Sequence, residues 1–373
     1  MKYFIYCLIG LVTFVSCREA EENQKSAIKK REKALTDSTG IIHGNSTSKY
    51  IGKPGVMIVV SENTVYTGEV QEALDSFFGA FIRPYYPPQQ KFELRHVSHE
   101  RFNKGLQRSR NLIFLELSDA IEENAPEVVI KKDYYAKTQL AAYFRAKTMD
   151  DLVAVILKES PRIVELFDTQ EWKREYYRHK RANNKVLKAK LKDQFGITLE
   201  LPKKGKYETN RKNFAKIMLP DRSRQMDLQT RSNAESSKTN FIQSGIMIWQ
   251  IPFKDSSQLN PAYLMRARDT ILKYNALHEF PGVYMGTQDH PAVLPVHTRI
   301  KIGDVEGYEF KGLYKFTGRL EPSGGKFWSF HFLHPKRNKI IAISGYLDAP
   351  PTMNPTLDLK RIQAIIYSLK IED

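Results

Sequence analysis

The chain has 373 residues, 41% of them hydrophobic, which is enough apolar material to bury a core in one large domain or in two packed halves. Its formal net charge of +16 raises the question of an anionic partner: nucleic acid, anionic lipid head groups, lipopolysaccharide phosphates or acidic glycans. The only cysteines, Cys7 and Cys17, lie near the N-terminus, which excludes a disulfide framework and cysteine metal sites from the body of the chain.

The first seventeen residues predict a lipoprotein signal. Lys2 supplies a positive charge, and residues 3–14 form an apolar run that is too short to span a bilayer. Small residues then lead to Cys17, in an arrangement that resembles the lipobox of bacterial lipoproteins, where the thiol is acylated and becomes the mature N-terminus. We therefore expect removal of residues 1–16, a lipid such as palmitate on Cys17, and a periplasmic or surface-exposed envelope location without nucleic acid. An ordinary signal peptide or an uncleaved anchor is the alternative.

Residues 17–49 are expected to form a flexible tether. They are rich in Glu, Lys, Ser, Thr and Asn and carry no sustained apolar period, so they cannot bury enough surface to order themselves. A flexible chain of that length spans on the order of 30 Å, which would hold the folded body clear of the membrane.

Residues 50–220 predict an N-terminal α+β half. It begins with a buried strand over 55–61 and an amphipathic helix that Thr67 can cap. A helix starting near Met149 is expected to restart at Ser160-Pro161 and to continue to about Phe195 as one long basic helix. Four further strands are expected between the first two helices, over 91–97, 111–117, 127–131 and 139–146.

After an irregular connection at 221–240, residues 241–373 predict a second α+β half. It contains a buried strand over 241–253, a helix begun by Asn260-Pro261 and a loop over 281–295 rich in Gly and Pro. Alternating residues from 308 to 347 indicate an antiparallel meander with one face in water, closed by a last helix. The predicted fold class is therefore α+β, with mixed and antiparallel sheets and flanking amphipathic helices.

Three segments, Phe241–Phe253, Gly312–Gly325 and Ile340–Lys370, together with the Cys17 motif, resemble an uncharacterised lipoprotein family of Bacteroidota. That family is known only as a domain of unknown function. The resemblance implies an envelope location and assigns no activity, cofactor or catalytic residue.

No catalytic or metal site is predicted. His331 and His334, like His96 and His99, are spaced to opposite faces of a strand, and loop histidines such as His290 and His297 are more often solvated than ligating. Ser323 and Lys326 match a serine-x-x-lysine spacing, but the glycines between them predict a turn rather than the helix that this chemistry needs. We expect no metal and no cofactor.

The strongest physical feature is the charge of residues 170–216. Fifteen Lys and Arg stand against five Asp and Glu, a net charge of +10. Such a segment is either a solvated helix or a surface that docks on an anionic lipid, glycan or envelope protein. The residues expected to form this surface, called here the basic set, are Lys173, Arg174, Arg178, Arg181, Lys185 and Lys188.

The sequence thus favours a non-catalytic binding or scaffold component of the cell envelope. The alternative is an envelope hydrolase whose site lies near the loop 281–297, which would require polar side chains to converge in a cleft.

Overall fold

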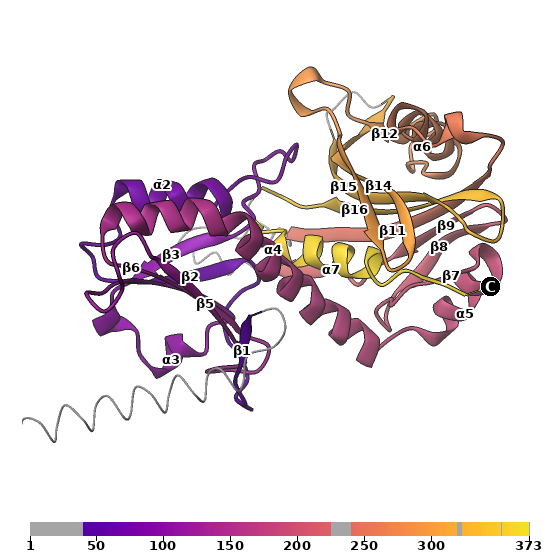
Figure 1. Ribbon diagram of the computed structural model, residues 1–373. Coiled ribbons are helices and arrows are strands. Elements are labelled where there is room, and N and C mark those ends of the chain that lie inside the picture. Colours follow the sequence, from indigo (N-terminus) through magenta and orange to yellow (C-terminus); the bar gives the residue numbers. More distant parts are fainter. Residues whose placement is uncertain (1–39, 225–239, 319–322, 352, 373) are drawn as a thin grey trace, which may run out of the picture. The chain divides into compact units, whose positions relative to one another are not determined.

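The computed structural model describes residues 40–224, 240–318, 323–351 and 353–372 (Figure 1). Its contacts divide the chain into two units. Unit 1 comprises the residues up to Phe78 together with Glu93–Phe167. Unit 2 comprises Gly79–Phe92 together with the residues from Asp168 onward. The α+β fold class is confirmed, with one mixed and two antiparallel sheets. The expected boundary at 221–240 differs from this division, which falls inside a helix. Cys17, the expected signal peptide and the expected tether up to residue 39 lie outside the described residues.

Unit 1 contains β1 (Ile41–His43), β2 (Val56–Val60), α2 (Gly68–Phe77), β3 (Glu93–Val97), η1 (His99–Arg101), α3 (Lys104–Gln107), β4 (Asn111–Leu117), β5 (Glu127–Lys132), β6 (Leu140–Ala146) and the start of α4 (Met149–Arg181). The sheet order is β1-β5-β6-β4-β2-β3, and β3, β2, β4 and β6 are parallel. Helix α2 and the first part of α4 lie on the same face of this sheet (Figure 1). Both faces are apolar, which explains the continuous hydrophobic run of β2.

Two expectations for this unit need correction. The chain is ordered before residue 50, since β1 pairs with β5 and the amide of Gly44 donates to the carbonyl of Lys132 at 2.7 Å. Strand pairing uses backbone groups, so a polar segment without an apolar period can still extend a sheet edge. Helix α4 does not restart at Ser160-Pro161 but is continuous through it. The proline removes one helical hydrogen bond, while neighbours such as Ile156 and Ile163 keep the helix packed.

Unit 2 contains α5 (Lys185–Phe195), β7 (Ile197–Thr198), β8 (Lys206–Arg211), β9 (Phe214–Met218), β10 (Arg222–Arg224), β11 (Asn240–Pro252), η2 (Ser256–Gln258), α6 (Pro261–Asn275), β12 (Tyr284–Thr287), η3 (Pro291–Val293), β13 (Val296–Ile302), β14 (Val305–Thr317), β15 (Gly324–Leu333), β16 (Lys339–Asp348), α7 (Thr356–Ile366) and β17 (Lys370–Ile371). Nine strands form an antiparallel sheet in the order β12-β14-β15-β16-β11-β9-β8, with β13 beside β14 and β10 beside β11. Helix α6 begins as the sequence predicts, because the Asn260 side chain accepts from the amide of Tyr263 at 2.9 Å.

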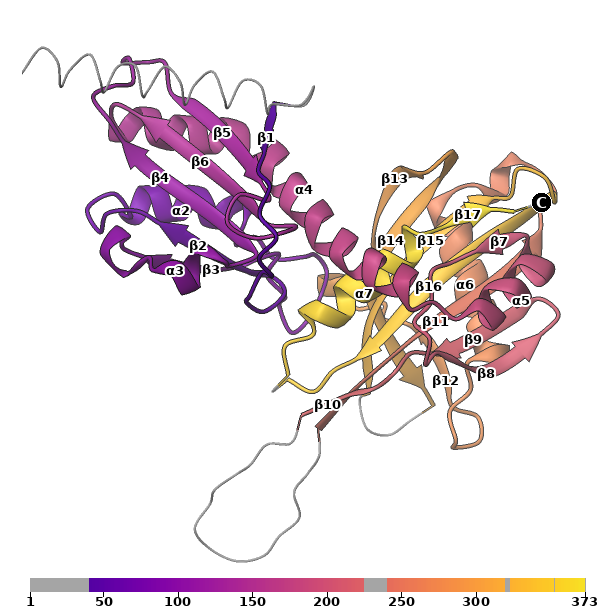
Figure 2. The ribbon, with the colours of Figure 1, turned by 90° about the horizontal axis from the view of Figure 1, so that it is seen from below.

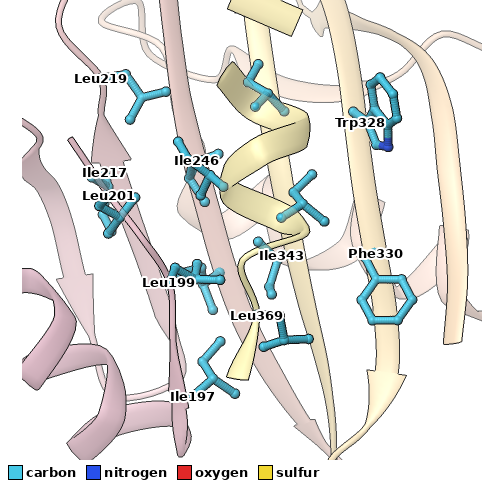
Figure 3. Close-up of a cluster of buried hydrophobic side chains, with 14 of the residues drawn as sticks. Ile197, Leu199, Leu201, Ile217, Leu219, Ile246, Trp328, Phe330, Ile343 and Leu369 are labelled. Atoms are coloured by element: carbon cyan, nitrogen blue, oxygen red, sulfur yellow. The ribbon is translucent and has the colours of Figure 1, made fainter. Parts of the chain in front are cut away.

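The sheet of unit 2 is covered on both faces, not on one as the alternation suggested. Helix α7 lies across β15, β16 and β11 (Figure 2), and Trp328 and Phe330 belong to the core beneath it (Figure 3). On the opposite face, Phe310 and Phe327 pack with apolar residues of α6. Glu309, which was expected to face water, is only 5% exposed.

The second part of α4 is held to α7 by polar and aromatic contacts. Asp168 accepts from Lys360 and from the Gln363 amide, and the Trp172 ring lies edge-on to Tyr367 with 5.2 Å between centroids. None of the helices in the described part of the chain is long and apolar enough to cross a membrane.

Candidate functional site

The basic set does not lie on one long helix, because α4 ends at Arg181 and a new helix begins at Lys185. Asn184 caps α5, its side chain accepting from the amide of Leu187 at 3.0 Å. Four members of the set remain exposed: Lys173, Arg178, Arg181 and Lys185.

For two members of the set the prediction is wrong, because they are not available to a surface ligand. Arg174 is buried, and its guanidinium lies 2.6 Å from the carboxylate of Glu171, which is fully buried. Lys188 is partly buried and pairs with Glu200 at 2.7 Å. Contact with the body of unit 2 has therefore turned these two cations inward.

The exposed members form two separate features, because successive helical residues are rotated by about 100°. Lys173, Tyr177 and Arg181 are spaced i, i+4 and i+8, so they share one side of α4 as an exposed outer stripe. Arg178 lies off this stripe and lines a pocket instead.

The pocket has a volume of about 230 Å³ and lies entirely within unit 2. Five stretches of chain supply its walls: the end of α4, the turn after β7, the residues after β9, β11 and α7. Its lining residues are Arg178, His179, Ala182, Pro202, Lys203, Lys204, Leu219, Pro220, Ser244 and Arg361.

The two lining guanidinium groups share a buried carboxylate. The Arg178 Nη1 lies 2.9 Å from the Glu175 Oε2, and the Arg361 Nε lies 3.7 Å from the same oxygen. Arg361 also lies 3.4 Å from Asp358, which is paired more closely with Arg222 at 2.6 Å. Glu175 thereby orients both arginines at the pocket without cancelling their combined charge.

The two lining lysines are exposed and, within the described residues, have no carboxylate in ion-pair distance. Backbone hydrogen bonds hold their turn: the Lys203 amide donates to the carbonyl of Ala182, and the Asn184 amide donates to Leu201, both at 2.9 Å. The Asn184 side chain also donates to the carbonyl of Gly205 at 3.0 Å. The ammonium groups therefore project from a turn that is fixed to the end of α4.

His179 lines the same pocket and is 5% exposed. Its Nδ1 is buried and makes no hydrogen bond to the described residues. Burial, assisted by the positive charges of Arg361 and Arg178, lowers the pKa of His179 to about 4. The imidazole is therefore neutral at pH 7.

A larger pocket in unit 1, of about 470 Å³, has no such charge bias. It lies between the loop at Asn124 and the first half of α4, and its charged residues are Asp151, Lys158, Glu159 and Arg162. Acidic and basic groups are equal in number there, and Arg162 pairs with Glu159 at 3.2 Å. Of these two pockets, only the smaller one therefore carries an excess of positive charge.

The alternative site at 281–297 is not an open loop. It contains β12 and η3, where the Nδ1 of His290 accepts from the amide of Ala292 at 3.2 Å. Asp289 pairs with Lys315, and His297 lies on β13 beside the rings of Tyr308 and Phe310. Among the described residues no group of three or more His, Cys, Asp or Glu side chains is arranged to hold a metal ion.

Two serine pairs also lack the geometry of a nucleophile. Lys326 lies in β15 and is buried, while Ser323 precedes that strand, so no helix brings the two together. Ser61 and His96, which the sequence did not single out, lie 3.1 Å apart between Oγ and Nε2. That nitrogen is also 3.3 Å from the Ser61 carbonyl, and the Ser61 hydroxyl donates to the carbonyl of Glu62 at 3.1 Å, so the hydroxyl is not directed at His96 as a nucleophile is at its base.

Comparison with known proteins shows two family matches that divide the chain at the break between α4 and α5. Residues 51–180 match DUF8532 and residues 183–368 match DUF4837, each described as a domain of unknown function. No curated protein matches the sequence.

Solved structures show only weak likeness. The Ran-binding protein Mog1p of Saccharomyces cerevisiae is 12% identical over 48% of this chain and 91% of its own, with a TM-score of 0.28. LpqN of Mycobacterium tuberculosis, involved in cell envelope biogenesis, is 13% identical over 48% of this chain and 83% of its own, with a TM-score of 0.25. Two models of domains of unknown function, DUF8532 and DUF4837, thus match successive parts of this chain.

Proposed function

We propose that this protein is a lipid-anchored component of the cell envelope that binds an anionic envelope surface without catalysing a reaction. Cys17 would carry the lipid, as the N-terminal sequence and its resemblance to a Bacteroidota lipoprotein family suggest. The partner would be an anionic lipid, a glycan or an acidic envelope protein rather than nucleic acid.

The observation that carries the proposal is the grouping of exposed, cationic side chains at the junction of α4 and α5. Lys173, Arg181 and Lys185 are exposed there, and Tyr177 adds an aromatic ring to the outer stripe. An exposed cation beside an anionic membrane contributes about 1 kcal/mol, and an aromatic side chain suits the interface between water and lipid. Positive charge and exposure therefore coincide in this part of unit 2.

Vesicle binding tests this proposal. In the full chain carrying Cys17→Ala, so that the anchor does not dominate, K173Q/R181Q/K185Q should weaken binding to phosphatidylglycerol vesicles by about a hundredfold. Binding of the parent protein should also fall steeply with added salt, because the Debye length shortens to about 8 Å at physiological ionic strength.

The control removes three exposed charges from unit 1. K53Q/R101Q/K104Q has the same net charge as the test variant and should bind vesicles almost as well as the parent. Equal binding by the parent and both variants would contradict the docking surface and indicate that these charges only keep the end of the helix solvated.

A further inference from the structure

We propose that the pocket lined by Arg178, Arg361, Lys203 and Lys204 binds the terminal phosphate of a phosphate monoester. This inference rests on the proposed function for its anionic partner and names the chemical group that the partner presents.

The charge balance of the pocket favours a dianion. Arg178, Arg361, Lys203 and Lys204 line it, and the two arginines share the single carboxylate of Glu175. The next carboxylate, Asp358, is itself neutralised by Arg222. An excess of three positive charges therefore surrounds the cavity. A phosphate monoester carries about −1.5 to −2 at pH 7, whereas a carboxylate or a phosphodiester carries only one negative charge.

The donors of the pocket are also of the kinds that bind phosphate. Guanidinium groups present planar pairs of N–H donors to phosphate oxygens, and ammonium groups add compact point charges. Glu175 holds the arginines before any ligand arrives, so less side-chain entropy is lost on binding. Ser244 lines the same wall.

His179 is the neutral member of the lining. It is 5% exposed, and its Nδ1 is buried and has no partner among the described residues. The neutral ring adds no positive charge to the cavity, so the excess of charge comes from the arginines and lysines alone.

The remaining wall limits what the phosphate is attached to. Pro202, Leu219 and Pro220 are apolar, and the whole cavity measures about 230 Å³. Pockets for drug-sized ligands are about 300–1,000 Å³, so this one accommodates a phosphate with only a few atoms of its ester group. A lipid would therefore present its head group here and keep its acyl chains outside.

Calorimetry with glycerol 3-phosphate, using the full chain carrying Cys17→Ala, tests this site. The parent should bind the probe saturably at one site, and glycerol itself should not bind. K203Q/K204Q should bind the probe at least about tenfold more weakly, because this variant loses two charge-assisted contacts. K173Q/R181Q, which removes two charges from the outer stripe, should bind it as the parent does.

Both variants change exposed side chains, so equal urea midpoints will show that they are folded. Absence of saturable binding by the parent, or equal weakening by the two variants, would overturn the pocket assignment. Weakening by K203Q/K204Q alone would support it.

Two further arms identify the source of the phosphate. If inorganic phosphate binds as tightly as glycerol 3-phosphate, the pocket recognises free phosphate. If phosphatidic acid vesicles bind more tightly than phosphatidylglycerol vesicles and glycerol 3-phosphate releases them, the monoester is a lipid head group. The first result would overturn the ester part of the assignment and leave a site for free phosphate, and the second would support the monoester.

The two proposals can fail separately. If the protein binds glycerol 3-phosphate but no anionic vesicle, the surface-docking function is wrong and the pocket stands. If vesicles bind through the outer stripe and the probe does not bind, the surface-docking function stands and the pocket assignment is wrong.

Discussion

The indole Nε1 of Trp328 donates to the Oε1 of Glu309 at 2.7 Å, and this bond lies inside the core of unit 2. The hydroxyl of Tyr367 donates to the same oxygen at 2.7 Å, while Lys311 lies 2.8 Å from the other oxygen. Burial, with the charge of Glu309, raises the pKa of the Tyr367 hydroxyl. One buried carboxylate thereby links β14, β15 and the end of α7.

Replacement of Glu309 should therefore destabilise unit 2 strongly. Glu309→Leu leaves the indole N–H of Trp328 and the hydroxyl of Tyr367 without their acceptor, at a cost of about 3 kcal/mol in the free energy of unfolding. Glu306→Leu, in the same strand, breaks only an exposed pair with Arg299 and should cost less than about 1 kcal/mol. Urea unfolding followed by tryptophan fluorescence measures both, and equal losses would contradict this role of Glu309.

The two fates of the basic set can be separated by stability. Arg174→Ala leaves the buried carboxylate of Glu171 without its 2.6 Å partner, so we expect a loss of about 3 kcal/mol. Arg181→Ala changes an exposed side chain and should shift the free energy of unfolding by about 0.5 kcal/mol or less. Circular dichroism during urea unfolding gives both values. If Arg174→Ala left the free energy of unfolding unchanged, Arg174 would not be held in the interior.

His179 predicts a dependence of stability on pH. Its pKa in the folded protein is about 4, below the ordinary value of 6.5, so the unfolded chain binds more protons between these two values. Stability from the neutral form is present above pH 6.5 and is lost as the pH falls toward 4. The part lost between pH 7 and pH 5 is about 2 kcal/mol.

The variant His179→Gln isolates this effect. It cannot titrate, so its free energy of unfolding should fall less than that of the parent between pH 7 and pH 5, by about 2 kcal/mol. The buried His331, whose pKa is also lowered to about 3 by burial and Arg268, is present in both proteins and cancels in the comparison. Parallel pH profiles for the two proteins would exclude His179 as the source.

Replacing Cys17 tests the prediction that this residue is acylated and anchors the protein to a membrane. Cys17→Ala removes the expected site of acylation, so the protein should lose its lipid and appear in the soluble fraction. Metabolic labelling with a palmitate analogue, followed by membrane fractionation, measures both properties. A variant that stays membrane-bound with the same lipid label as the parent would show that Cys17 is not the anchor.

Local chemistry made several elements predictable from the sequence. Asn260-Pro261 begins α6 because a capping side chain and a preset backbone angle act within one turn. The run at Val56–Val60 is a strand buried on both faces, and the helix after Thr67 begins at Gly68, although the Thr67 side chain makes no capping hydrogen bond. The strong positive charge of residues 170–216 is likewise a property of composition alone.

Features that depend on distant partners could not be predicted. The residues around 182–184 are polar and interrupt no apolar pattern, so only the structure shows that α4 ends at Arg181 and that Asn184 caps the separate helix α5. Glu309 followed the alternation of a wet face, but α7 covers that face and buries its carboxylate. The spacing of residues in a strand does not indicate that a helix about fifty residues later in the chain will cover one of its faces.

The sequence by itself determined the amount of positive charge, the α+β pattern and the expectation of an anchored N-terminus, since each depends on residue type and local spacing. Only the tertiary structure decided which cations point outward. It buried Arg174 against Glu171, left Lys173 and Arg181 on the exposed side of α4, and set Arg178 beside Arg361 of a distant helix. The physical reason is that desolvation and ion pairing act between chain segments that the order of residues does not bring together.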